Sequence, residues 1–306
     1  MESGASTRVI TGLTWASGEP LVRVRDDGAT TSALVPLVGL VLNYQADRDS
    51  ARVCVGKTPF RSADGDHYDC MNRPESGSKL CTQCSISDAT FASNLHHAHT
   101  KDRAELDPAI AEHLRQPNVL YLAAFRDGSI KVGTSTAKRH HKRLTEQGAW
   151  RALLVATTTD GYAVRDIEDR ITADLEIPQS VSIGRKLEGM ASPVSDDRLD
   201  EELAWRADGV RSLQDRMSDS RIEPQREPWS FPGADAAIWA SLHRYPVRLD
   251  TGQHDLEVVA ACGRVVVVQR RGTGDVFAAD VGQLFGIELR LGDYESDELA
   301  VQDSLF

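Results

Sequence analysis

Apolar and polar positions follow β-type patterns near both ends of the chain. Short apolar runs at Leu21–Val24 and Val35–Leu42 are bounded by Gly-Glu-Pro and Asp-Asp-Gly turn sequences. Three further apolar runs lie between residues 257 and 279, separated by glycine turns. The sequence therefore predicts an N-terminal β module over residues 1–53 and a C-terminal β-rich module over residues 236–306.

Residues 107–180 show a mixed pattern of strands and helices. Asn118–Phe125 is an apolar run of strand length, and Ile130–Thr134 follows it after an Arg-Asp-Gly-Ser turn. A third strand is predicted at Ala152–Thr157, and apolar residues spaced by four predict a helix over Gly161–Leu175. We expect a small antiparallel sheet with helices here, which makes the whole chain α+β.

The two segments that flank this central region are polar. Residues 54–100 lose apolar periodicity and are rich in Cys, His, Asp, Ser and Gly, so they cannot bury enough apolar surface to fold alone. Residues 181–235 are acidic, and they predict a helix that runs from Ser195 to about Met217. Three prolines in the segment 221–233 then indicate a linker.

Composition and charge narrow the function classes. The 306 residues include 35 Lys and Arg but 46 Asp and Glu, a formal net charge of −11, so nucleic acid would have to bind at a local basic patch. No apolar run is long enough to span a membrane and no signal-peptide pattern is present, so we expect a cytoplasmic protein with reduced thiols. The sequence does not indicate an oligomeric state.

Four of the five cysteines, Cys54, Cys70, Cys81 and Cys84, fall within 31 residues. The Cys81-Thr-Gln-Cys84 pair supplies two thiolates at a spacing that suits tetrahedral zinc, and the other two cysteines can close the site. A closed four-thiolate site has no open position for water, so we expect a structural zinc. The fifth cysteine, Cys262, lies in a β segment and is expected in the core.

Histidines leave alternatives open at this site. His67 lies between the first two cysteines and can replace one of them as a ligand. His96, His97 and His99 follow the pair and can compete for the metal. Free thiols are a second interpretation. A redox-active Cys-x-x-Cys is disfavoured because no thioredoxin-like strand precedes the pair.

The central segment also carries a dense basic run, with Lys131 just upstream of it. The run consists of Lys138, Arg139, His140, His141, Lys142 and Arg143. Basic side chains at the end of a strand and the start of a helix can contact phosphates, and histidines can add charge or move protons near neutral pH. By itself the run equally fits a solvated helix face.

The residues from Asn118 to Leu175 resemble the GIY-YIG nuclease superfamily. The first motif corresponds to Leu-Tyr ending at Tyr121, and the second to Lys-Val-Gly ending at Gly133. The superfamily often has a tyrosine where this chain has Lys131, and its phage-type KIG branch shares the lysine. The matching arginine on the next helix is Arg143.

Arg139 is the alternative to this arginine, because the spacing from the glycine to Arg143 is slightly long. The matching acidic residue is Glu168 on the later helix. Arg165 precedes Glu168 by three residues, so the two side chains share a helix face. The resemblance places all of these groups in one site.

The resemblance implies a metal-dependent endonuclease that hydrolyses phosphodiester bonds of DNA or RNA. Glu168 would hold Mg²⁺ or Mn²⁺, Tyr121 would act near the attacking water, and Arg143 would bind the phosphate. Lys131 would put a positive charge where the superfamily has a phenol. The nucleic acid would be bound by Lys138, Arg139, His140, His141, Lys142 and Arg165.

A second resemblance covers more of the chain. A cysteine cluster followed by Tyr121–Ala123, Lys131–Thr134, Arg143–Ala149 and Arg165–Glu168 is similar to an uncharacterised bacterial family of zinc-cluster proteins of unknown function. It supports an architecture: a zinc-stapled N-terminal β module, a central GIY-YIG-like domain and a C-terminal β-rich segment.

Two other functions fit the same residues. One is a non-catalytic zinc protein that binds nucleic acid, in which Lys131 marks a lost active site. The other is an enzyme that acts on a small phosphorylated ligand, because a net charge of −11 disfavours wrapping a long nucleic acid.

Overall fold

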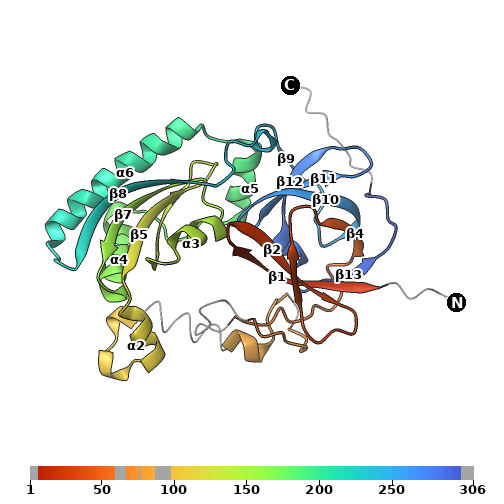
Figure 1. Ribbon diagram of the computed structural model, residues 1–306, viewed down its shortest axis with the longest axis horizontal. Helices are drawn as coiled ribbons and strands as arrows, with labels where there is room; N and C mark the ends of the chain where they lie inside the picture. The colour runs from red at the N-terminus through yellow and green to blue at the C-terminus, as the bar shows by residue number, and fades with distance from the viewer. Residues whose placement is uncertain (1–5, 59–66, 76, 87–97, 298–306) are drawn as a thin grey trace. The chain divides into compact units, whose positions relative to one another are not determined.

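The computed structural model describes residues 6–58, 67–75, 77–86 and 98–297. The chain divides into two units (Figure 1). Residues 1–59, 64–85 and 242–306 belong to the first unit, and residues 60–63 and 86–241 to the second. Each unit is described by itself below.

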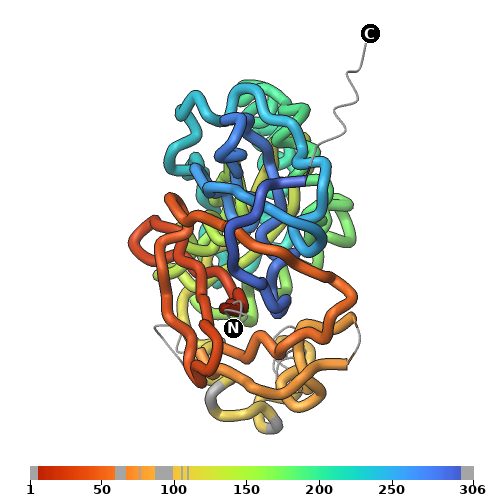
Figure 2. Tube along the Cα trace, turned by 90° about the vertical axis from the view of Figure 1, so that its right-hand side faces the viewer, coloured from red at the N-terminus to blue at the C-terminus, as the bar shows by residue number. Residues whose placement is uncertain are grey.

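One nine-stranded sheet forms the first unit, with the strand order β3-β2-β1-β13-β4-β10-β11-β12-β9. The strand β13 (Glu288–Leu291), from the C-terminal part of the chain, pairs antiparallel with both β1 (Thr7–Ala16) and β4 (Val41–Ala46). Strands from the two ends of the sequence therefore lie side by side (Figure 2). The others are β2 (Glu19–Asp26), β3 (Ala33–Pro36), β9 (His243–Arg244), β10 (Gly252–Cys262), β11 (Val265–Arg270) and β12 (Val276–Asp280).

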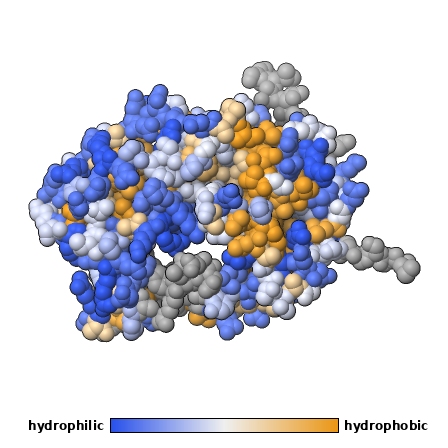
Figure 3. Space-filling model, viewed as in Figure 1, coloured by the Kyte–Doolittle hydropathy of each residue, from blue (hydrophilic) through white to orange (hydrophobic). Residues whose placement is uncertain are grey.

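Local sequence explains how these strands begin and end. Ser17 and Gly18 join β1 to β2 with φ angles of 51° and 84°, the backbone that a two-residue hairpin turn of the right twist requires. The run Val265–Val268 in β11 is buried at every position, as expected for a strand covered on both faces. Leu34, Val38 and Val41 are exposed, and apolar side chains gather on the face of this unit shown in Figure 3.

The second unit contains a four-stranded antiparallel sheet with the order β6-β5-β7-β8. Its central strand β5 (Asn118–Ala124) is buried at every residue. The other strands are β6 (Ile130–Thr136), β7 (Arg151–Thr158) and β8 (Ile222–Ser230). The α-helices of this unit are α2 (Pro108–Leu114), α3 (His140–Glu146), α4 (Gly161–Leu175), α5 (Ile183–Ala191) and α6 (Asp196–Met217).

The helix α4 presents one side to the core of this unit. The Asp160 side chain caps it by accepting hydrogen bonds from the backbone N–H groups of Tyr162 and Ala163. Ile167 and Ile171 are fully buried, as the spacing by four predicts. Glu168 lies beside Ile167 in the sequence and is buried as well, so a carboxylate enters the interior of the unit.

The α+β class predicted from the sequence is confirmed, with a cysteine cluster near the N-terminus and a β-rich C-terminal segment. The predicted linker was wrong, because residues 222–230 form the strand β8. Pro224 and Pro228 are compatible with this strand because β8 lies at the edge of the sheet, where prolines are tolerated. Within the described residues, no helix combines the length and apolar character that a membrane crossing requires.

Candidate functional site

The four clustered cysteines come together in the first unit. The sulfur atoms of Cys54, Cys70, Cys81 and Cys84 all lie within 4.8 Å of one another. The Cys70 and Cys81 sulfurs are 3.8 Å apart, and a tetrahedral zinc with Zn–S bonds of about 2.3 Å requires sulfurs about 3.8 Å apart. The four thiols can therefore hold a metal ion such as zinc.

Backbone and side-chain N–H groups point at the sulfur atoms of this cluster. The Cys81 N–H donates to Cys54 Sγ at 3.3 Å, and Asn72 Nδ2 donates to Cys81 Sγ at 3.7 Å. A hydrogen bond from the Cys84 N–H, with the one from Asn72, lowers the pKa of Cys81 from 9.0 to about 6. These hydrogen bonds favour the thiolate form of Cys81, which is the form that binds metal.

His67 does not join the four sulfurs, although the sequence left it as a possible ligand. Its Nδ1 lies 3.4 Å from the Thr58 hydroxyl and its Nε2 lies 3.8 Å from Asp69. Asp69 in turn accepts hydrogen bonds from the backbone and hydroxyl of Ser32. The segment that holds Cys70 is thereby attached to the sheet. His96 and His97 lie outside the described residues.

In the second unit, Tyr121 and Gly133 face each other across β5 and β6. A Cβ atom on Gly133 would lie 2.7 Å from the Tyr121 hydroxyl oxygen, so the phenol ring lies over the glycine. Lys131 is two residues before Gly133, and alternate residues of a strand share a face. The sheet therefore presents the phenol and the amine on the same side.

The helix α3 brings a guanidinium and an amide to the Tyr121 hydroxyl. Gln147, at the C-cap of α3, donates a hydrogen bond from Nε2 to this hydroxyl at 3.1 Å. Arg143 is one helical turn earlier, and its charge acts on this hydroxyl. Burial raises the pKa of Tyr121, while the charge of Arg143 and the hydrogen bond from Gln147 oppose the increase. The phenol stays protonated at neutral pH.

The helix α4 contributes the carboxylate of Glu168, which is only 3% exposed. Arg165 Nη1 donates to Glu168 Oε2 at 2.5 Å, one helical turn away. The charge of Glu168 raises the pKa of both Tyr121 and Lys131. The helix α4 packs against β5 and β6, and α3 packs against β6, so Tyr121, Lys131, Arg143 and Glu168 come from four elements that contact one another.

Lys131 is influenced by two other positively charged side chains. Burial, followed by the charges of Arg143 and Lys186, lowers its pKa from 10.5 to about 8, and Glu168 only partly opposes this. Its Nζ donates to the Gln179 carbonyl at 3.3 Å. The amine is therefore close to the balance between its charged and neutral forms in mildly basic solution.

Gln147, Lys186 and His113 were missed by the sequence reasoning. Lys186 reaches the site from α5, where its Nζ donates to the Gln147 carbonyl at 2.7 Å and lies 4.5 Å from the centre of the Phe125 ring. Burial and the charges of Arg165 and Arg139 lower the pKa of His113 on α2. Lys186 lies outside the segment Asn118–Leu175 that carries the resemblance. A single basic residue there is too weak a signal to predict a role in the site.

The rest of the basic run surrounds the site less tightly. Glu146 lies 3.7 Å from Arg139 and 3.9 Å from Lys142, which offsets part of their charge. The rings of His140 and His141 are in contact, with centres 4.0 Å apart and planes tilted by 39°. Lys138 is exposed at the turn before α3. None of these five basic side chains is buried, and Arg143 is exposed as well.

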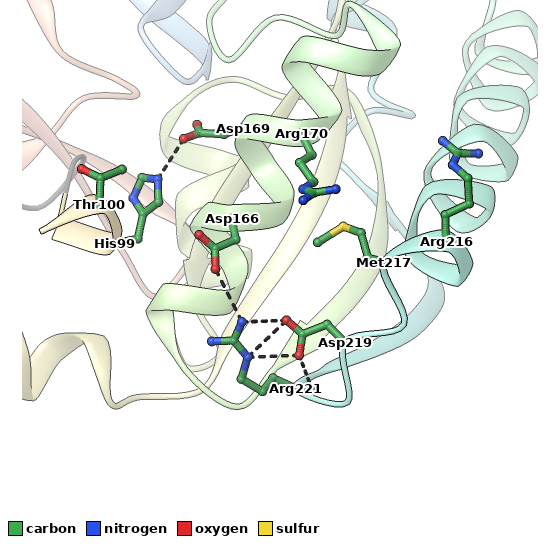
Figure 4. Close-up of a pocket in the computed structure, with 9 residues that line it drawn as sticks. All are labelled: His99, Thr100, Asp166, Asp169, Arg170, Arg216, Met217, Asp219 and Arg221. Carbon is green, nitrogen blue, oxygen red and sulfur yellow. Dashed lines mark hydrogen bonds and ion pairs between the residues drawn. The ribbon is translucent and has the colours of Figure 1, made fainter.

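A separate hollow of about 680 Å³ lies on another side of α4, near η1 (Ala98–Thr100) and the end of α6 (Figure 4). There Arg221 binds Asp219 at 2.7 Å and Asp166 at 3.5 Å. His99 donates to or accepts from Asp169 at 2.9 Å, so it is not a ligand of the cysteine cluster. The convergent residues do not line this hollow.

Comparison with protein families matches residues 54–235 to a family described as "Protein of unknown function (DUF2797)". The chain belongs to the DUF2797 family. The match confirms the predicted resemblance to a family of unknown function, and the structure shows the cysteine cluster. The matched region of this DUF2797 chain begins at Cys54 and includes Tyr121, Lys131, Arg143 and Glu168. Comparisons with curated proteins and with solved structures gave no significant match.

Proposed function

We propose that the second unit binds nucleic acid and hydrolyses its phosphodiester bonds at the Tyr121 site. The observation that carries this proposal is the convergence of four side chains: a phenol, an amine, a guanidinium and a carboxylate, each from a different element. A phosphodiester reaction needs groups of these kinds, because negative charge builds on the phosphate oxygens.

The charge balance of the site favours an anion. The charges of Arg143 and Lys186 both act on Lys131, and Glu168, the carboxylate among the described residues that acts on it, is already bonded to Arg165. Cations that repel one another in a partly buried place are stabilised by an anion between them. Arg143 can also bind two phosphate oxygens through its planar guanidinium.

Glu168 is the residue that would hold Mg²⁺ or Mn²⁺. One carboxylate is enough, because Mg²⁺ is commonly held by one or two carboxylates together with substrate phosphates and water. The bound ion would neutralise charge on the phosphate and lower the pKa of a water molecule. Arg165 would have to turn away from Glu168, and it then becomes available to the substrate.

The protein's own groups supply the remaining steps. Arg143 orients the phosphate and offsets the negative charge that develops on it. Lys131, with a pKa of about 8, accepts a proton from the attacking water when it is neutral. The Tyr121 hydroxyl, held by Gln147, positions that water. These roles are those that the GIY-YIG resemblance implies, with Lys131 as the departure from the commoner tyrosine.

The cysteine cluster completes the proposal with a structural role. Four thiolates would close the coordination of a zinc ion, which would hold the described parts of the cysteine-rich segment, residues 54–58, 67–75 and 77–85, on the first unit. Reduced cysteines of this kind fit a reducing compartment such as the cytoplasm.

A second candidate is a non-catalytic protein that binds nucleic acid. The observation that favours it is the state of Glu168, which is 3% exposed and bonded to Arg165 at 2.5 Å. A carboxylate in this state serves as an internal partner of an arginine rather than as a metal ligand. The basic groups would then retain phosphates without cleaving them.

Cleavage assays separate the two candidates. The full chain is incubated with Mg²⁺ and with labelled single-stranded, duplex and branched DNA and with RNA. We expect cleavage by the native protein and a loss of at least about a hundredfold in Glu168→Gln, because the metal contributes several kcal/mol to the transition state.

Asp174→Asn is the matched control, because Asp174 is an exposed carboxylate on the same helix. This variant should cleave at the native rate. Binding without cleavage by the native protein would establish the second candidate. Cleavage that persists unchanged in Glu168→Gln would refute the assignment of the site.

A further inference from the structure

A group of six charged residues in the first unit has no part in the site described above. Four of them are cationic and two are carboxylates, and we call them the Lys79 cluster. It consists of Arg52, Lys79, Arg248, Arg264, Asp250 and Asp280. They come from the segment after β4, the cysteine-rich segment and the loops that flank β10, β11 and η4 (Val281–Leu284).

The two carboxylates are each held by an arginine through two hydrogen bonds. Arg248 donates to Asp250 from Nε at 2.8 Å and from Nη2 at 2.7 Å. Arg264 donates to Asp280 from Nε at 2.7 Å and from Nη2 at 2.8 Å. The side chains of Asp250 and Asp280 are only 1% and 7% exposed. The negative charge of each carboxylate is therefore neutralised by its own arginine.

The other two cations, Lys79 and Arg52, contact the segment that follows Asp280. Lys79 Nζ donates to the Gly282 carbonyl at 2.5 Å and lies 5.2 Å from the centre of the Phe285 ring. Arg52 donates from Nη1 to the Phe285 carbonyl at 2.9 Å, and its Nη2 is 3.8 Å from Asp250. A Cβ on Gly282 would lie 2.4 Å from Arg264 Nε, so Arg264 packs directly on this glycine. The six residues therefore form one continuous cluster.

The cluster keeps a local excess of two positive charges in a chain whose net charge is −11. The guanidinium-bearing side chains of Arg248 and Arg264 remain 52% and 40% exposed after they have bound their aspartates. A paired guanidinium still has donors that its carboxylate does not use. The cluster thus offers solvent a set of N–H donors and a positive potential, without an exposed carboxylate of its own.

We propose that the Lys79 cluster binds phosphate groups of a nucleic-acid backbone. Several fixed guanidinium groups beside an ammonium group match the oxygen atoms of successive phosphates better than they match a single small anion. Lys79 lies two residues before Cys81, so a metal in the cysteine cluster would also hold this lysine in place. The proposal does not require that the protein cleave nucleic acid, and it does not depend on the Tyr121 site.

The experiment measures the affinity of the full, zinc-loaded chain for a labelled 20-nucleotide single-stranded DNA in the absence of added Mg²⁺. Binding is measured between about 50 and 200 mM salt, where phosphate contacts give a linear dependence of log K on log salt concentration. The two test variants are Lys79→Gln and Arg248→Gln. Heparin is the competitor that reveals binding of any polyanion.

Arg271→Gln is the matched control. Arg271 is 48% exposed and, like Arg248, pairs with an aspartate, Asp255, at 3.1 Å, although through one hydrogen bond rather than two. It lies at the opposite end of the β10–β11 hairpin from Arg264. Its loss changes the net charge of the protein by the same amount without touching the cluster.

We expect each test variant to weaken binding and to reduce the salt slope by about 1, while the control keeps the native slope. Native slopes in Lys79→Gln and Arg248→Gln, with unchanged zinc content, would overturn the proposal. If Lys79→Gln loses zinc, Arg248→Gln decides the matter, since Arg248 has no contact with the cysteine segment among the interactions of the described residues. Displacement of DNA by heparin at equal phosphate and sulfate concentration would also overturn specificity for nucleic acid.

Discussion

At the scale of single residues, the central feature is the environment of Lys131. A lysine beside a glutamate normally stays charged. Here burial and the charges of Arg143 and Lys186 lower the pKa of Lys131 by more than the charge of Glu168 raises it. The sequence could indicate Tyr121, Lys131, Arg143 and Glu168 as candidates, because each lies at a position on which the resemblance to a nuclease superfamily rests. It could not indicate Lys186, because its role depends on how α5 packs and on no local pattern.

The pH dependence of cleavage tests the role of Lys131. Because burial and two neighbouring cations lower its pKa to about 8, the neutral amine that accepts a proton increases as the pH rises through this value. We expect the cleavage rate to rise between about pH 7 and 9 and then to level off. The measurement is the initial rate at saturating Mg²⁺ over this range.

Lys131→Arg is the control for charge, since a guanidinium stays protonated throughout this range. It should bind DNA like the native protein but lose the rising limb of the profile. A profile of native shape in Lys131→Arg would show that another group accepts the proton.

At the scale of secondary-structure elements, hydrophobic periodicity predicted most of the second unit well. The helix over Gly161–Leu175 was predicted with the observed bounds, because its apolar side and its Asp160 cap are both local. β8 was missed because its two prolines suggested a linker, and pairing with β7 is not visible in the local sequence.

The packing of α5 against the β5–β6 turn gives a prediction at this scale. A Cβ on Gly189 would lie 2.2 Å from the Asp127 backbone nitrogen, whereas one on Gly184 in the same helix would meet only the Ser182 hydroxyl oxygen at 3.8 Å. Alanine favours a helix over glycine by about 1 kcal/mol, so propensity alone favours both substitutions.

We expect Gly189→Ala to lower the free energy of unfolding by about 1–3 kcal/mol, because the helix must move from the turn. Gly184→Ala should leave it unchanged or raise it slightly. Urea unfolding measures both. Equal effects of the two substitutions would contradict the close packing of α5 and hence the placement of Lys186.

At the scale of the whole molecule, the first unit joins parts of the chain that are far apart in sequence. β13 pairs with β1 at Arg8 and Leu289, about 280 residues apart. Periodicity shows that each segment is a strand, but it carries no information on which strands share a sheet. The cysteine cluster could be predicted because its ligands lie close together in the sequence, and their chemistry limits what they can bind.

Removal of metal tests how the cysteine cluster supports the first unit. Arg25 donates to the Cys70 carbonyl at 3.2 Å and Asp69 is bound to Ser32, so the cysteine segment is attached to β2 and to the residue before β3. Hydrogen exchange after treatment with a zinc chelator should show lost protection in residues 67–85 and in β2 and β3, while β5 and β7 keep theirs. Unchanged exchange throughout the first unit would contradict a structural metal.

The most direct test of the central claim is a crystal structure of Glu168→Gln with a short oligonucleotide and Mg²⁺. The account predicts a backbone phosphate in contact with Arg143 and Lys131 and close to the Tyr121 hydroxyl. An oligonucleotide bound elsewhere, with these three side chains arranged as they are in the free protein and in contact with no phosphate, would contradict it.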